Sequence, residues 1–329
     1  MPGPEASAAD IVLEPYREAH MAQWNAFVAA SRNGTFLFDR GFMDYHAARF
    51  IEASLIARRG GRIVALLPAH RSGADLLSHG GLTYGGFIVG ADSGAAQMQA
   101  LFGALLQYAA SQRIARVLYK TVPAMYHRLP SEDDRYALFR CGASLWKRDL
   151  LSVIAPGETA QRSAQRQRML KRSADDADLR IVEDAGWSAF WPLLEQVLSE
   201  RHGQKPVHSL QEIERLAARF PQQVRLITAQ YQGQVSAGVV LFETDRVSHA
   251  QYFAADAQAR RLGLLDRVVD VAIAAAQASG RWFDFGISTE DGGQHLNEGL
   301  LRWKEGFGAR SLVHDAYLLS VPDRAVSGV

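Results

Sequence analysis

The sequence predicts a mixed α/β protein that repeats one order of elements in two halves of similar length. Each half reads as a strand, two helices, three strands, a helix, a strand, a helix and a final strand, and such repetition indicates two copies of one topology. Gly60-Gly61 and Gln232-Gly233 separate two apolar runs at the same place in each half, which predicts a β-hairpin there. With 329 residues, 48% of them hydrophobic, the chain can bury two cores. We therefore expect two tandem α/β domains that form one compact unit with a cleft between or beside them.

Residues 1–154 are expected to form the first domain. Its longest helix is predicted over 95–111, because Met98, Leu101 and Leu105 recur on one helical face. The stretch 76–89 is predicted to be extended, with interruptions at its paired glycines. The other expected elements are a strand from Ile11, helices over 20–30, 40–50 and 133–139, and strands over 53–58, 62–70, 116–119 and 144–153.

Residues 180–329 are expected to form the second domain, after a basic connecting segment over 155–179. Its long helix is predicted over 262–278, where Leu264, Val268 and Ala272 recur at helical spacing. The other expected elements are helices over 187–201, 210–220 and 296–306, and strands over 180–182, 224–230, 234–242, 247–253, 281–285 and 312–319.

Charge and composition exclude several classes of protein. The 36 basic and 35 acidic side chains nearly cancel, so no overall field attracts nucleic acid or an anionic membrane. No run of about eighteen apolar residues occurs, and the single cysteine, Cys141, excludes an intramolecular disulfide. No zinc or EF-hand spacing, Gly-x-Ser-x-Gly pattern or Walker A pattern is present. We expect a cytoplasmic protein without a membrane span or a bound metal.

Three short motifs in the second half carry a family resemblance. They are Arg260-Arg261-Leu262-Gly263 before the long helix, Asp284-Phe285-Gly286 in the next strand, and Trp303-Lys304-Glu305-Gly306-Phe307-Gly308 in the last helix. On these motifs the chain resembles the C-terminal half of tandem GNAT-fold proteins of the FemAB-like type. The resemblance implies two GNAT-like domains and transfer of an acyl or aminoacyl group onto an amine. It also implies donor binding and catalysis in the second domain, with a degenerate first domain on the acceptor side.

The donor site is expected at the start of the long helix. The GNAT superfamily binds donor phosphates through backbone amides of an Arg/Gln-x-x-Gly-x-Gly/Ala loop, and helix N-termini attract anions. Residues 260–265 contain one glycine, Gly263, where acetyl-CoA enzymes tend to have two, so the donor stays open between acyl-CoA and aminoacyl-tRNA. A helix-start glycine without a ligand is the alternative. We expect acyl-CoA, such as acetyl-CoA, as the co-substrate and no permanently bound cofactor. The expected donor-binding residues are Arg260, Arg261, Gly263, Leu264, Asp284 and Ser288.

Lys304, His249 and Tyr252 are the candidate catalytic residues. FemAB-like proteins place a lysine at the position that Lys304 matches, which implies that its charge meets the acyl carbonyl or a donor phosphate. A lysine that extends from the helix end toward water is the alternative. His249 lies on the strand before the donor loop and suits acceptance of the amine proton, with a structural histidine as the alternative. Alternation along this strand predicts His249, Gln251 and Phe253 on one face and Tyr252 on the other.

Candidate acceptor-binding residues come from three stretches. The run 78–86 has four glycines that let the backbone approach a ligand, although a bulged strand with tight turns explains them equally. The basic run 161–177 suits a phosphate clamp or a solvated helical linker. The loop 201–209 corresponds to one that lines the acceptor site in this superfamily. In chain order, the candidates are His79 and Tyr84, Arg166 and Arg168, and His202 and His208.

Three hypotheses for function follow from the residues and the resemblance. The first is acyl transfer to a small-molecule or nucleotide-linked amine, such as an amino-sugar nucleotide used in cell-envelope synthesis. The second is an aminoacyl-tRNA-dependent transferase, which the neutral charge balance and the lack of a heptad insertion disfavour. The third is a catalytically silent GNAT-like module that binds a ligand or a partner.

Overall fold

The computed structural model describes residues 11–78, 80–158, 161–173, 176–183 and 186–322. The chain divides into two compact units: unit 1 is Met1–Arg148 with Val313–Val329, and unit 2 is Asp149–Leu312. Two long strands, β9 (Ser144–Ile154) and β17 (Arg310–Ser320), each contribute residues to both units. These boundaries differ from those expected at 154 and 179, because the division falls within β9 and the end of β17 belongs to unit 1. The roles assigned to the two domains, and a cleft between them, stay predictions.

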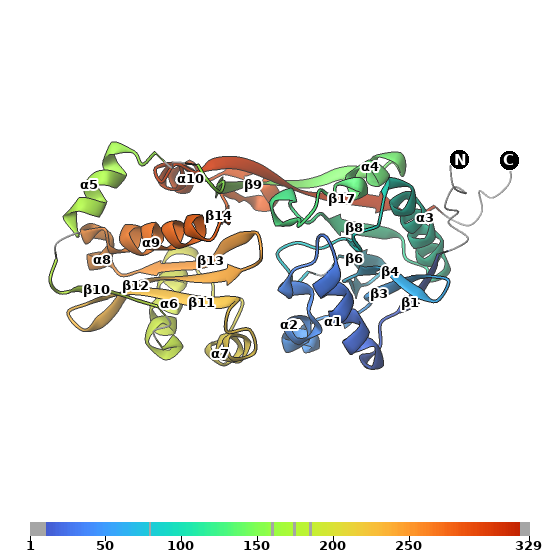
Figure 1. The fold of residues 1–329 in the computed structure, drawn as a ribbon, viewed down its shortest axis with the longest axis horizontal. Coiled ribbons are helices and arrows are strands. Elements are labelled where there is room, and N and C mark those ends of the chain that lie inside the picture. Colours follow the sequence, from blue (N-terminus) through green and yellow to red (C-terminus); the bar gives the residue numbers. More distant parts are fainter. Residues whose placement is uncertain (1–10, 79, 159–160, 174–175, 184–185, 323–329) are drawn as a thin grey trace. The chain divides into compact units, whose positions relative to one another are not determined.

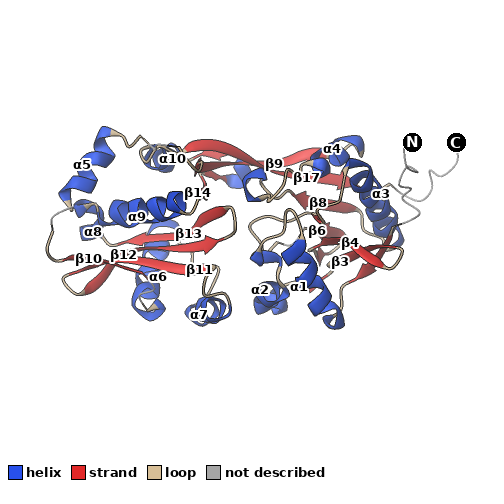
Figure 2. Ribbon diagram, in the orientation of Figure 1, coloured by secondary structure: helices blue, strands red, loops and turns tan. Residues whose placement is uncertain are grey.

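Unit 1 consists of short strands and four α-helices (Figures 1 and 2). In chain order they are β1 (Val12–Pro15), α1 (Met21–Ala30), α2 (Arg40–Met43), β2 (Ile51–Glu52), β3 (Leu55–Arg59), β4 (Arg62–Leu67), β5 (His70–Ser72), β6 (Asp75–Leu77), β7 (Ile88–Val89), α3 (Ala95–Ser111), β8 (Arg116–Lys120) and α4 (Asp133–Arg140). One sheet has the order β1-β3-β4-β7, and the other strands have the order β17-β8-β6-β5-β2. The predicted long helix α3 supplies Leu101, Phe102 and Leu105 to the core of unit 1.

The hairpin predicted at Gly60-Gly61 is confirmed, since β3 and β4 pair antiparallel on either side of it. The extended stretch predicted over 76–89 is wrong in its middle, because β6 and β7 at its ends are the only strands among its described residues. Gly86 adopts φ +83°, and a Cβ there would lie 2.7 Å from the Tyr119 hydroxyl. The same hydroxyl accepts a hydrogen bond from the amide of Phe87 at 2.7 Å. The chain therefore folds back onto β8 at Gly86 instead of continuing as a strand.

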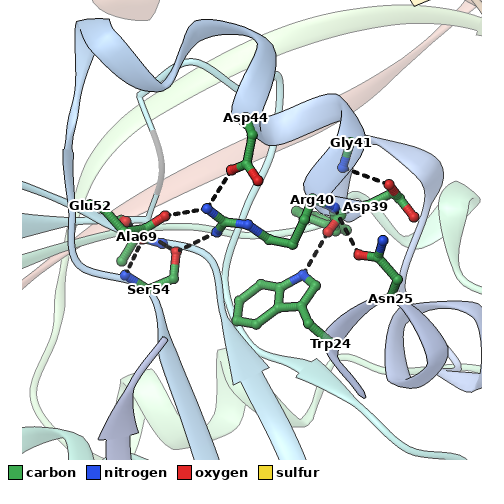
Figure 3. A network of polar contacts seen from close by, with 10 residues as sticks. Trp24, Asn25, Asp39, Arg40, Gly41, Asp44, Glu52, Ser54 and Ala69 are labelled. Atoms are coloured by element: carbon green, nitrogen blue, oxygen red, sulfur yellow. Dashed lines mark hydrogen bonds and ion pairs between the residues drawn. The ribbon is translucent and has the colours of Figure 1, made fainter. Parts of the chain in front are cut away.

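Arg40 forms a buried ionic network at the start of α2. Its side chain is 4% exposed and donates to Asp44 and Glu52 at 2.5 Å each and to Ser54 at 3.5 Å (Figure 3). Its Cζ lies 3.8 Å from the ring centroid of Tyr16. Burial lowers the pKa of Arg40, but Glu52 and Asp44 outweigh this effect and raise it above its usual value. The network ties α2 to the sheet strands of unit 1.

Unit 2 has one continuous sheet with the order β10-β11-β12-β13-β14-β9 and a separate two-stranded pair (Figure 2). Its elements are α5 (Ala164–Arg172), β10 (Leu179–Glu183), α6 (Trp187–His202), α7 (Leu210–Arg219), β11 (Val224–Tyr231), β12 (Gln234–Glu243), β13 (Val247–Ala255), α8 (Ala257–Leu262), α9 (Leu264–Ala278), β14 (Trp282–Ile287), β15 (Thr289–Glu290), β16 (His295–Leu296) and α10 (Glu298–Glu305). The hairpin predicted at Gln232-Gly233 is confirmed by the antiparallel pairing of β11 and β12.

Helices cover both faces of the sheet in unit 2 (Figure 1). The apolar side of α9, including Leu264, Val268 and Ala272, packs on one face together with Phe285 of β14. On the opposite face, Trp191 of α6 contacts β13. The described residues contain no helix that combines the length and the apolar character needed to cross a membrane.

Each unit is completed by a strand from the other half of the sequence. β9 follows unit 1 in the chain but pairs antiparallel with β14, with Val153 opposite Asp284. β17 follows unit 2 but pairs antiparallel with β8, with Tyr317 opposite Tyr119. The two halves therefore exchange their final strands.

Candidate active site

The central feature of unit 2 is the point at which β13 and β14 stop pairing. These parallel strands are paired only where Val247–His249 face Trp282–Asp284. β13 then continues to Ala255 and β14 to Ile287 without pairing to each other. Ends of paired strands in such sheets are common positions for ligand groups.

A β-bulge at Gln251 sets which side chains of β13 share a face. Val240 of β12 pairs with Tyr252 and Leu241 pairs with Ala250, so Gln251 has no partner across the ladder. Ala250 and Phe253 consequently both face the core beneath α9. The predicted alternation is therefore wrong, because the extra residue breaks the period of two.

His249 and Asp284 form a buried pair where the two strands part. His249 Nδ1 lies 2.8 Å from Asp284 Oδ2, and Asp284 is 1% exposed. The other oxygen, Asp284 Oδ1, accepts the amide N–H of Gly286 at 2.8 Å. A Cβ at Gly286 would lie 3.5 Å from His249 Cε1, so the glycine leaves room beside the imidazole ring. Asp284, predicted as a donor-binding residue, thus contacts a candidate catalytic histidine.

Lys304 lies on the other side of Gly286. It is 2% exposed, and its Nζ donates to the carbonyl oxygens of Gly286 at 3.0 Å and Ile287 at 2.5 Å. The pairing of β14 with β9 is irregular between Asp284 and Ile287, which is where this ammonium group binds the backbone. Burial lowers the pKa of Lys304 to about 8, and the nearby Asp284 opposes that shift. The lysine therefore points into the protein and does not extend to water.

A cavity of about 680 Å³ lies in unit 2 beside these strands. Its lining is mostly apolar, and it comes from α5, the end of α6, β13, the α8–α9 junction and α10. The lining residues are Gln165, Arg166, Met169, Val197, Leu198, Phe253, Ala254, Ala255, Arg260, Gly263, Leu265, Asp266, Asn297, Gly299, Leu300 and Trp303. This size and composition are typical of a pocket for a small organic ligand.

The charges in the cavity wall are paired with protein groups. Arg166 of α5 forms a buried ion pair with Asp266 of α9, and Trp303 Nε1 donates to the same carboxylate at 3.1 Å. Burial raises the pKa of Asp266, and the Arg166 charge opposes the shift. Arg260 donates to the carbonyl of Ala255 at 2.6 Å. The wall thus offers an apolar surface that contains one neutralised ion pair, Arg166 with Asp266, and the positive charge of Arg260.

The comparisons with known proteins identify the fold around this site. Residues 158–305 match the family described as Acetyltransferase (GNAT) domain. The crystal structure of FemX superposes with a TM-score of 0.65 at 11% identity, covering 94% of this chain and 97% of that chain. Residues 158–305 therefore form a GNAT acetyltransferase domain, and the whole chain has the fold of FemX.

Two further solved structures share the fold of this chain. One is the C-terminal domain of a putative lysylphosphatidylglycerol synthetase from Agrobacterium fabrum, with a TM-score of 0.52, 14% identity, and coverage of 78% of this chain and 81% of that chain. The other is L-PGS from Bacillus licheniformis, with a TM-score of 0.54, 12% identity, and coverage of 80% and 82%. None of the curated proteins matches the sequence.

The predicted donor loop of the GNAT domain is more closed than expected. The helix predicted over 262–278 is broken at Gly263, which has φ +79° and separates α8 from α9. The amide of Gly263 donates to Arg260 O at 3.3 Å, and a Cβ at Gly263 would lie 2.7 Å from Met169 O of α5. Only glycine fits this close approach. Leu264 is fully buried in the core, so its side chain does not line the cavity.

Other predicted residues of the GNAT domain are held by nearby groups. Tyr252 lies 2.7 Å from His208 Nδ1 through its hydroxyl, and burial raises the pKa of Tyr252 to about 12. Ser288 lies 3.0 Å from Ser152 of β9, hydroxyl to hydroxyl. Arg168 is exposed and donates to its own helix at Ala164. None of these side chains lines the cavity.

The acceptor-site predictions have different outcomes in the structure. In unit 1, Tyr84 is buried and donates to Thr35 Oγ1 at 3.0 Å, as part of an aromatic core. His79 and the side chain of His202 lie outside the described residues. Arg261, which was expected in the donor site, is exposed, and its carbonyl accepts a hydrogen bond from Arg172 at 2.7 Å. Among the described residues, no group of three or more His, Cys, Asp or Glu side chains is placed to hold a metal ion.

Two residues of the site were missed by the sequence analysis. Asp266 and Trp303 were not singled out, although both line the cavity. A signal for Asp266 was available, because it is an acidic residue two positions after Leu264, within the apolar repeat of α9. A carboxylate at such a position must find a partner, and here it finds Arg166 and Trp303.

Proposed function

We propose that the GNAT domain transfers an acyl group from acyl-CoA to a primary amine by direct attack. One observation carries the proposal. β13 and β14 stop pairing after His249, and the part of β13 beyond that point lines the cavity. Phe253 and Ala255 of β13 line the cavity on the side of α9. His249 lies at the last paired position of the same strand. Donor and acceptor would meet at this opening, with the proton acceptor beside it.

The chemistry requires one proton to be removed. The amine nitrogen attacks the thioester carbonyl, a C–N bond forms, the C–S bond breaks, and the CoA sulfur leaves. His249 takes the proton that the nitrogen loses. The leaving thiolate takes a proton from solvent to become the thiol, and His249 returns its proton to solvent. Tyr252 stays a neutral phenol at pH 7, since its pKa is raised to about 12, so we assign it a hydrogen-bonding role. The products are an amide and free CoA.

The cavity wall favours a donor with a long neutral arm over one with phosphates next to its acyl group. Asp266 contributes a buried carboxylate to the wall, and Arg166 is neutralised by it. The Gly263 amide is already bonded to Arg260 O. In acyl-CoA, an uncharged pantetheine arm separates the thioester from the phosphates. Exposed Arg168, Lys171 and Arg172 of α5 remain available for phosphates outside the cavity.

The second candidate is aminoacyl transfer from aminoacyl-tRNA. Two observations favour it: the fold similarity to FemX and to lysylphosphatidylglycerol synthetase domains, and the closed backbone at Gly263, which differs from an open phosphate loop. For either donor, we propose a nucleotide-linked amine of cell-envelope synthesis as acceptor, and this rests on the family resemblance alone.

Thiol release tests the first candidate. The purified protein is incubated with acetyl-CoA and longer acyl-CoAs together with a panel of amines that includes amino-sugar nucleotides, and acylated product is identified by mass. Thermal titration with the same thioesters gives donor binding separately, and a ligand at about 100 times its Kd stabilises the native state by about 2.7 kcal/mol. Absence of both thiol release and stabilisation contradicts the CoA donor. Retention of the protein on immobilised tRNA at physiological salt would then favour the second candidate.

A further inference from the structure

A series of hydrogen bonds links three buried side chains, Lys304, Asp284 and His249, through the backbone of Gly286. Lys304 Nζ donates to the Gly286 carbonyl at 3.0 Å, the Gly286 amide donates to Asp284 Oδ1 at 2.8 Å, and Asp284 Oδ2 lies 2.8 Å from His249 Nδ1. Gly286 has φ +75°, a conformation that suits glycine, and it bonds to a different group on each side. The carboxylate therefore cannot rotate without losing the Gly286 amide.

The direction of the last hydrogen bond follows from the chemistry of its partners. An ionised carboxylate only accepts hydrogen bonds, so the proton between Asp284 and His249 belongs to Nδ1. The neutral imidazole has one N–H, so its Nε2 carries a lone pair. Nε2 has no hydrogen-bond partner among the described residues. His249 is thereby presented as a proton acceptor in a single tautomer.

We propose that Asp284 and Lys304 are positioning residues that act through His249. Asp284 fixes the tautomer of His249 and stabilises the imidazolium that forms when it takes a proton. Lys304 acts one step further away, by holding the Gly286 turn and placing its positive charge near Asp284. This differs from the predicted role of Lys304 in contact with the donor. The proposal deepens the proposed function and rests on it for the identity of the reaction.

The tautomer of His249 is measurable without any substrate. In protein labelled with ¹⁵N-histidine at pH 7.5, above the usual pKa of histidine and below the pKa of about 8 of Lys304, we expect His249 to show a protonated Nδ1 and an unprotonated Nε2. In Asp284→Asn the carboxamide can donate to Nδ1, so the proton should move to Nε2. Ser288→Ala is the matched control, because Ser288 is buried just beyond the same strand and bonds to Ser152, not to His249. It should leave the His249 signals in place.

Lys304→Met and Lys304→Arg separate charge from packing. Lys304→Met should broaden or mix the two tautomers, and Lys304→Arg, which keeps the charge, should restore the Nδ1–H form at least in part. With an active acyl donor, Asp284→Asn should lower kcat by about 10²–10⁴-fold with little change in KM, as expected for a wrong tautomer.

The outcomes distinguish this proposal from the proposed function. An Nε2–H tautomer in the wild type, or an unchanged tautomer in Asp284→Asn, overturns the positioning role whatever the enzyme transfers. An unchanged tautomer in Lys304→Met would show that Lys304 does not act on His249. If the tautomers behave as expected but no thioester is consumed, the positioning role stands and the proposed reaction fails.

Discussion

Each unit places a lysine close to a histidine, but the hydrogen bonds at Nδ1 of the two histidines run in opposite directions. In unit 2, His249 donates from Nδ1 to Asp284, and Lys304 lies beyond that carboxylate. In unit 1, His70 Nδ1 accepts the amide N–H of Gly80 at 2.9 Å, which places its proton on Nε2. The neighbouring Lys120 donates to the carbonyl of Leu82 at 2.5 Å. The same residue types thus give a free proton acceptor in one unit and a backbone-bound histidine in the other.

The carboxylate explains this difference. Burial and the charge of Lys120 both lower the pKa of His70. Glu52 opposes them, but it also binds the guanidinium of Arg40. In unit 2, Asp284 lies between His249, which donates to it, and Lys304, whose positive charge lies near it. In our proposal, a buried acid between two basic groups suits unit 2 to proton transfer, and its absence at the corresponding place in the described part of unit 1 favours a structural role there.

The largest expected effect comes from removing each histidine. His249→Gln should lower kcat for acyl transfer by about 10²–10⁴-fold, the usual contribution of a general base. His70→Gln should leave kcat within a few-fold of the wild type, because His70 bonds to the backbone of Gly80. Steady-state thiol release for both variants tests the comparison. A loss in His70→Gln equal to that in His249→Gln would assign chemistry to unit 1.

Arg40 should be important for stability and not for chemistry. Arg40→Met leaves Asp44 and Glu52 without their cation, and breaking a buried pair in this way costs about 3–5 kcal/mol. The free energy of unfolding from urea titration measures the effect. Arg302→Met, which removes an exposed pair with Glu298, is the control and should change stability little. Equal losses of unfolding free energy in the two variants would mean that the buried Arg40 network stabilises the fold no more than an exposed ion pair does.

Lys304 and Lys120 should give the same pH dependence of stability. The pKa of each is lowered from 10.5 to about 8 by burial, so between these values the unfolded chain binds more protons than the folded one. The free energy of unfolding contributed by each lysine therefore rises with pH across this window, by up to about 3 kcal/mol.

Comparison of the wild type with Lys304→Met and Lys120→Met from pH 7 to 9.5 isolates each contribution. Each variant should lose part of the rise. Only Lys304→Met should also alter acyl transfer, and an equal effect of Lys120→Met on the rate would remove the distinction between the units.

The smallest expected effect concerns two glycines with similar backbone angles within unit 2. Gly263 has φ +79° and Gly233 has φ +81°, so alanine costs about 1–2 kcal/mol at either position from backbone conformation. At Gly263 the new Cβ would also lie 2.7 Å from Met169 O, whereas it would meet nothing within 4 Å at Gly233. Gly263→Ala should therefore destabilise more in urea titration. Equal losses of unfolding free energy in the two variants would show that α5 moves away from the new Cβ without destabilising the fold.

Local patterns predicted most of the elements correctly. The spacing of Leu264, Val268 and Ala272 predicted the buried side of α9, and Gln232-Gly233 predicted its hairpin, because both depend on residues close in sequence. The bulge at Gln251 was missed, since one inserted residue leaves composition unchanged while it shifts every later side chain to the other face.

The partners within the site depend on contacts that are distant in sequence. His249 and Asp284 were both singled out, but as members of different sites, and their hydrogen bond joins residues 35 apart. Arg166 and Asp266 are 100 residues apart, so the neutral cavity wall was not predictable from either one. Lys304 was expected near water or the donor, but its two backbone acceptors arise from the irregular pairing at Gly286.

The exchange of final strands has a consequence for synthesis on the ribosome. β8 ends at Lys120, and β17, its neighbour in the sheet, begins at Arg310. Since the ribosome adds about 5–20 residues per second, β17 is made on the order of ten to forty seconds after β8. During this time one edge of β8 is without its native neighbour, and open strand edges recruit other chains. Unit 2 is continuous in sequence and has no such delay. Unit 1 is therefore the first to be made and the last to be completed.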